Sequence, residues 1–236
     1  MFFEQRASAA STKKASGKLL GAIGVYVDDF LFVESEDPAW KKIMTQIKGL
    51  YTWGKHDYKE FVLCGVGYKQ LTDFSIVLDQ REYVQEKLKP NTLTIGGDLK
   101  NAKDTDLVKD PGWVRKFRGA NGALQWLVTN TRPDLAAEVS ISAGTAGVGI
   151  TKGAIVNVQK IMRKAMSRVD VEIKFQPIPM KDLRFVTFHD AGWASRPDGS
   201  SQGGDMVFAT HQKLLLGNEA AISLVDWKSW KLKRVC

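Results

Sequence analysis

Two adjacent acidic residues, Asp28 and Asp29, lie in the middle of an apolar stretch, residues 21–34 with the sequence GAIGVYVDDFLFVE. Small and β-branched residues precede the pair and bulky apolar residues follow it, which predicts two short strands joined by a turn at the acids. An unpaired carboxylate pair costs several kcal/mol to bury, and a divalent cation is a common compensation at a tight turn. A plain polar turn is the alternative, because Asp is frequent in turns.

A resemblance favours the metal site. The run Tyr26-Val27-Asp28-Asp29 resembles the Tyr-X-Asp-Asp hairpin of reverse transcriptases, and the order of segments after it resembles the copia group of long-terminal-repeat retrotransposons. The resemblance implies that Asp28 and Asp29 are catalytic acids that bind Mg²⁺ or Mn²⁺. It also implies that Tyr26 contacts nucleic acid.

A second segment of resemblance covers residues 118–135. The run RGANGALQWL leads to Thr131-Arg132-Pro133-Asp134, and copia-type polymerases carry a Gly-x-Leu helix followed by Thr-Arg-Pro-Asp in this order. Pro at the start of a helix with an acid in its first turn suits the helix dipole, so we interpret this run mainly as a helix junction. Contact of Arg132 with a phosphate is the alternative.

Residues 154–169 are predicted to form a helix with one apolar and one basic face. Such a basic stripe is most often a solvated surface. Next to a polymerase palm it is also a candidate for sequence-independent contact with a nucleic-acid backbone, and the family carries a basic helix at this place. The candidate nucleic-acid-binding residues of this face are Lys160, Arg163, Lys164 and Arg168.

The C-terminal residues resemble the opening of the RNase H domain that follows the polymerase in copia elements. Residues 183–188 alternate like a strand and lead to His189-Asp190. In that family an Asp at the end of the first strand binds a metal ion, so the resemblance implies that Asp190 is a catalytic, metal-binding acid. Gly192 departs from the pattern, because an acid often stands there. Residues 203–209 and 220–230 are expected to complete a three-stranded meander.

Supporting elements are predicted around these sites. Residues 35–38 form a helix-start signal, with Ser35 or Asp37 as the cap and Pro38 in the first turn. The apolar residues after it recur at helical spacing, which indicates a helix that supports the acid hairpin. Residues 60–79 are predicted to form two strands around a turn at Thr72-Asp73, in a segment where related polymerases hold the primer. Asp79 and Glu82 form a capping-box pattern. Residues 89–112 are predicted to be a loop.

The predicted fold class is therefore α+β in two parts. Residues 1–180 are expected to form the C-terminal part of a reverse-transcriptase palm followed by a helical thumb or connection region, and residues 181–236 an incomplete RNase H-like three-stranded sheet. The third palm carboxylate of the family is expected upstream of Met1, and the second RNase H carboxylate after Cys236. We thus expect part of a magnesium-dependent RNA-directed DNA polymerase with linked RNase H, inactive as this chain alone. The alternatives are an inactive remnant that binds nucleic acid non-specifically and a metal-independent protein-interaction module.

Composition is compatible with this interpretation. The net charge of +8 favours an anionic partner, and the expected partners are an RNA template, a DNA primer, deoxynucleotides and an RNA–DNA hybrid. No membrane partner and no disulfide between Cys64 and Cys236 are expected, and the location is expected to be intracellular, in cytoplasm or nucleus. Residues 1–21 are basic and rich in Ser and Ala, as in a transit peptide, but we interpret them as a lead-in to the hairpin strand, without a signal peptide.

Overall fold

The computed structural model describes residues 2–4, 19–147 and 149–232, with side chains described from residue 19 on except at Asp98. The chain divides into two compact units, Met1–Tyr58 and Lys59–Cys236. Helices and antiparallel sheets together confirm the α+β class. The predicted boundary between residues 180 and 181 lies inside the second unit and stays a prediction. Most of the lead-in expected over residues 1–21 lies outside the described residues.

The first unit is an antiparallel sheet followed by one helix. Helix α1 begins where the sequence predicts, because the Asp37 side chain accepts a hydrogen bond from the Ala39 backbone N–H at 2.9 Å and Pro38 occupies the first turn. The elements are strands β1 (Phe2–Glu4), β2 (Leu19–Tyr26) and β3 (Asp29–Val33), in that order across the sheet, and helix α1 (Pro38–Leu50).

Helix α1 supports the sheet through a small apolar core. Trp40 and Met44 are buried against Leu20 and Ile23. Gly21 makes this close approach possible, since a Cβ atom at that position would lie 2.6 Å from the Trp40 ring. The predicted helix beneath the acid hairpin is thus present.

The second unit opens with a four-stranded antiparallel sheet, in which the prediction for residues 60–79 is wrong by one strand. A tight turn at Cys64 and Gly65, with φ values of 53° and 75°, splits the predicted first strand into two. A two-residue turn with both φ values positive matches the twist of the flanking strands. The sheet order is β4 (Glu60–Leu63), β5 (Val66–Gln70), β6 (Ile76–Asp79) and β7 (Glu172–Phe175).

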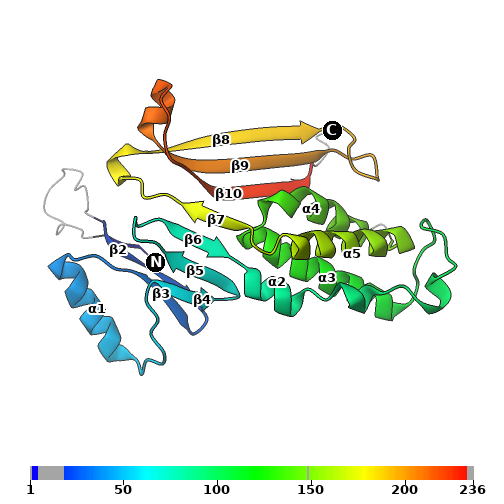
Figure 1. Ribbon diagram of the computed structural model, residues 1–236, viewed down its shortest axis with the longest axis horizontal. Helices are drawn as coiled ribbons and strands as arrows, with labels where there is room; N and C mark the ends of the chain where they lie inside the picture. The colour runs from blue at the N-terminus through cyan, green and yellow to red at the C-terminus, as the bar shows by residue number, and fades with distance from the viewer. Residues whose placement is uncertain (1, 5–18, 148, 233–236) are drawn as a thin grey trace, which may run out of the picture. The chain divides into compact units, whose positions relative to one another are not determined.

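Four helices beside this sheet enclose the main core of the second unit (Figure 1). The predicted capping box does not form, because the Asp79 carboxylate accepts a hydrogen bond from the Arg81 backbone N–H at 2.9 Å and the N-cap residue is Gln80. The segment 89–112 contains two short 3₁₀ turns, η1 (Pro90–Leu93) and η2 (Gly97–Leu99), and buries Leu93. The helices are α2 (Arg81–Lys87), α3 (Pro111–Asn130), α4 (Ala136–Thr145) and α5 (Lys152–Ser167), with η3 (Pro133–Leu135) between α3 and α4.

The C-terminal part of the second unit is the expected three-stranded meander. Its strands pair antiparallel in the order β10-β9-β8, and β10 lies next to α4 and β7 (Figure 1). The indole N–H of Trp227 donates to the Val128 backbone oxygen at 2.8 Å and joins the meander to α3. The elements are η4 (Met180–Asp182), β8 (Leu183–Gly192), β9 (Gln202–His211), η5 (Gln212–Leu216) and β10 (Ile222–Lys231). Among the described residues, no helix combines the length and apolar character needed to cross a membrane.

Candidate metal and nucleic-acid sites

The acid pair lies at the tip of a tight hairpin. Strands β2 and β3 pair Tyr26 with Asp29, so Val27 and Asp28 form a two-residue turn. Val27 has a φ of 55°, in the left-handed region that β-branched residues rarely occupy, and its side chain is 84% exposed. The sequence thus predicted the hairpin but placed its turn at Asp28 and Asp29, one residue too late, because Asp29 is the first residue of β3. The strained turn residue Val27 gave no signal in the pattern.

An aromatic cluster braces one face of this hairpin. The ring of Trp53 lies 5.1 Å from that of Phe30 and 5.8 Å from that of Phe32, edge-on in both cases. The indole N–H of Trp53 donates to the Lys48 backbone oxygen at 2.9 Å, which fixes the cluster to the end of α1. Because side chains alternate along a strand, Tyr26 and Asp29 share the opposite face.

The free-energy cost of burying an unpaired carboxylate pair does not arise at Asp28 and Asp29. Both Asp28 and Asp29 are exposed, so folding does not need a cation to compensate a buried charge. No cluster of three or more His, Cys, Asp or Glu side chains forms a metal site among the described residues. Two adjacent exposed carboxylates nevertheless fit Mg²⁺ or Mn²⁺, because Mg²⁺ is commonly held by one or two carboxylates together with substrate phosphates and water.

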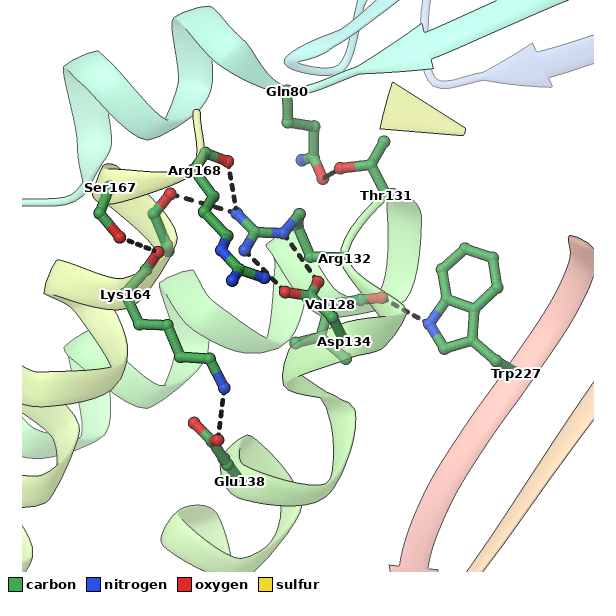
Figure 2. A network of polar contacts seen from close by, with 11 residues as sticks. Gln80, Val128, Thr131, Arg132, Asp134, Glu138, Lys164, Ser167, Arg168 and Trp227 are labelled. Atoms are coloured by element: carbon green, nitrogen blue, oxygen red, sulfur yellow. Dashed lines mark hydrogen bonds and ion pairs between the residues drawn. The ribbon is translucent and has the colours of Figure 1, made fainter. Parts of the chain in front are cut away.

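The predicted basic face lies on α5. Lys160 and Arg163 on α5 are exposed, and so is Arg168, which follows the last residue of the helix. Contact of these residues with nucleic acid stays a prediction. Lys164 differs, since its ammonium group lies 2.6 Å from the Glu138 carboxylate on α4 (Figure 2). Glu138 lies 26 positions away in the sequence, so no local spacing pointed to this pair. Lys164 would have to leave Glu138 to bind a phosphate.

Arg132 has a structural role in the second unit. Its side chain is 2% exposed and forms two hydrogen bonds of 2.8 Å to the two carboxylate oxygens of Asp134 (Figure 2). Its Nη1 also donates to the backbone oxygens of Ala165 and Arg168, each at 3.1 Å. Arg132 therefore ties the junction between α3 and α4 to the end of α5, and its burial contradicts the alternative of a phosphate contact.

The same contacts set the charge state of Asp134. Partial burial by itself raises the pKa of this carboxyl, but the hydrogen bonds and positive charge of Arg132, helped by Lys164, outweigh it. The net result is a pKa below the ordinary value, so Asp134 stays ionised.

Nearby, the Thr131 hydroxyl donates to the buried Gln80 side-chain oxygen at 2.9 Å, a long-range contact that no sequence pattern indicated (Figure 2).

Asp190 lies within β8, two residues before the strand ends. It pairs with Gly204 of β9, its side chain is exposed, and its carboxylate accepts a hydrogen bond from the Ala191 backbone N–H at 2.8 Å. Asp190 belongs to the second unit and the hairpin acids to the first. Asp28 and Asp29 are neighbours in the chain, and the structure groups Lys160 and Arg163 on α5, with Arg168 just after the helix.

Comparisons of the chain with protein-family models, with curated proteins and with solved structures found no match.

Proposed function

We propose that this chain is a portion of a retrotransposon-type RNA-directed DNA polymerase whose hairpin acids hold catalytic magnesium. The observation that carries the proposal is the tight hairpin, in which the turn residue Asp28 and the first residue of β3, Asp29, follow each other at the end of a sheet braced by aromatic rings. A tight turn on a packed sheet limits how far the acids can move relative to each other, which a reactive site requires.

Each residue of the hairpin has a distinct role in this proposal. The carboxylates of Asp28 and Asp29 would hold the ion. When bound, the ion supplies activation of the primer 3′-hydroxyl and neutralises the charge of the leaving pyrophosphate. Tyr26 shares a face with Asp29 and contacts the nucleic acid there.

Two further parts of the chain extend the proposal. The exposed cations Lys160, Arg163 and Arg168 bind the duplex backbone without reading its sequence. Asp190 supplies one carboxylate of a linked RNase H-like site over residues 181–236. The described residues contain no three-acid group, so we propose that the chain alone carries out neither reaction.

A second candidate function is non-specific nucleic-acid binding without catalysis. The exposed basic face of α5 and the net charge of +8 favour it independently of the hairpin.

Binding of Mn²⁺, followed by electron paramagnetic resonance, tests the metal site. With a primer–template duplex and a nucleotide present, the wild-type chain is expected to bind at least one Mn²⁺ that the double variant Asp28→Asn/Asp29→Asn does not bind. The control Glu82→Gln/Glu86→Gln removes two exposed acids of α2 and is expected to retain wild-type binding. Equal Mn²⁺ binding by the wild type and the Asp28→Asn/Asp29→Asn variant would remove the hairpin from the site.

Duplex affinity tests the basic face separately. Changing Lys160, Arg163 and Arg168 to Glu is expected to lower affinity for every duplex sequence and to reduce the slope of log K against log salt by about 3, one for each lost phosphate contact. The control changes the exposed residues Lys42, Lys181 and Lys213 to Glu and alters the net charge equally. If duplex binding depends on α5 and no Mn²⁺ binds at the hairpin, the second candidate function holds.

A further inference from the structure

Strand β8 is a long, unprotected sheet edge. It forms the outer strand of the order β10-β9-β8, and no other described strand pairs with its free side (Figure 1). Its ten residues pair with β9 without a register shift, and the sequence 183–192 contains no Pro and no Lys. Edge strands are often protected by bulges, Pro, Lys or short length, and β8 has none of these four, although it carries the charged residues Arg184 and Asp190. The edge strand β4, by contrast, has four residues.

The side chains of β8 also expose apolar surface that another strand could cover. Phe185 is 62% exposed and Phe188 is 59% exposed. They project to opposite faces of the sheet because their positions differ by an odd number. A strand added at this edge would shield apolar surface on both faces while it satisfied the free backbone groups.

We propose that β8 pairs antiparallel with β8 of a second copy of this chain, about a two-fold axis at Thr187. In this register Arg184 of each copy lies opposite Asp190 of the other, so two oppositely charged cross-strand pairs form. Between them Val186 lies opposite Phe188 on the same face. On the other face Phe185 lies opposite His189.

Charge selects this register over its neighbours. Registers that keep each face continuous differ by steps of two residues. One step in one direction places Arg184 opposite Phe188, and one step in the other places it opposite Gly192, so both charge pairs are lost. Within one copy, the Arg184 guanidinium bonds only to neutral oxygens of the described residues, including that of the Gln212 side chain at 3.1 Å. Its charge is thus available to the second copy.

The affinity and the register have different sources. Exposed ion pairs contribute little net free energy and mainly select the alignment. Backbone hydrogen bonds along ten residues and the covered Phe side chains supply the attraction. This inference concerns assembly and does not depend on metal binding at the hairpin or on polymerase activity. In the dimer, Arg184 of the second copy competes for the Asp190 carboxylate with the metal ion proposed there.

Sedimentation equilibrium on the full chain tests the proposal. The wild type is expected to show a concentration-dependent mass that approaches twice the 26.2 kDa of one chain. Arg184→Asp or Asp190→Arg alone places like charges opposite each other and is expected to weaken dimerisation by at least about tenfold. An equimolar mixture of the two variants is expected to form heterodimers, and the double swap Arg184→Asp/Asp190→Arg is expected to dimerise as the wild type does.

The controls Arg115→Asp and Glu86→Arg change exposed charges on α3 and α2 and are expected to leave dimerisation unchanged. A monomeric wild type, or single variants that dimerise like the wild type, would overturn the proposal. So would a double swap that stays monomeric with a wild-type circular dichroism spectrum. If either single variant fails to fold, the double swap alone decides.

Discussion

The carboxylates of Asp29 and Asp134 occupy opposite kinds of environment. Asp29 lies at an exposed hairpin tip, and no ion pair or side-chain hydrogen bond holds its carboxylate among the described residues. Asp134 is partly buried and joined by two hydrogen bonds to the fully enclosed Arg132. An acid that the fold has already satisfied stabilises the structure, whereas an exposed acid on a braced turn is available to a ligand. Burial and partners, more than residue type, therefore distinguish the two roles.

The largest expected effect is at the buried pair of Arg132 and Asp134. Arg132→Ala leaves Asp134 and two backbone oxygens without their donor, and it is expected to lower the free energy of unfolding of the second unit by about 3 kcal/mol. Urea denaturation measures the loss. Arg115→Ala, at an exposed position of α3, is the matched control and is expected to cost less than about 0.5 kcal/mol. A loss below about 1 kcal/mol at Arg132 would contradict its structural role.

The pH dependence of the same pair gives a second, smaller effect. The pKa of Asp134 is lower in the folded chain than its ordinary value of 3.8, so its contribution is fully present above that value and is lost as the pH falls through the folded pKa. Urea denaturation of wild type and Asp134→Asn is therefore expected to show the larger difference near pH 7 and a shrinking difference below about pH 4. A difference that grows on acidification would reverse the assigned sign.

A change at the turn residue Val27 tests the exposed hairpin tip. Val27→Gly relieves a left-handed backbone conformation, and it is expected to raise the free energy of unfolding of the first unit by about 1 kcal/mol. The control Val25→Gly lies in β2 at an ordinary strand conformation and is expected to destabilise, because Gly weakens a strand. Equal destabilisation by both changes would show that the tip stores no strain.

The sequence predicted the elements whose signals are local. The start signal at residues 35–38 placed the start of α1, and the structure selects Asp37 as its cap. Apolar spacing placed α5 and the three C-terminal strands. The acid hairpin was predicted in the same way, from a polar pair between two apolar runs. Such signals lie within a few residues of one another, so they can be recognised without knowledge of the tertiary fold.

The errors and omissions have non-local causes. The extra turn in residues 60–79 depends on positive φ at Cys64, which is not a residue type that marks such turns. The partner of Lys164, the partner of Thr131 and the backbone oxygens that accept from Arg132 come from distant segments. Exposure of the acid pair also could not be predicted, because apolar neighbours in sequence do not fix which atoms the fold covers.

Cleavage by Fe²⁺-generated hydroxyl radicals tests the central claim most directly, because Fe²⁺ that replaces Mg²⁺ cuts the nucleic acid beside it. With the chain bound to a primer–template duplex, cuts are expected to cluster within a few nucleotides of the primer 3′ end. They are expected to disappear in Asp28→Asn/Asp29→Asn and to persist in Glu82→Gln/Glu86→Gln. The same clustered cuts with the Asp28→Asn/Asp29→Asn variant, or uniform cleavage along the duplex with the wild type, would contradict a metal site at the hairpin tip.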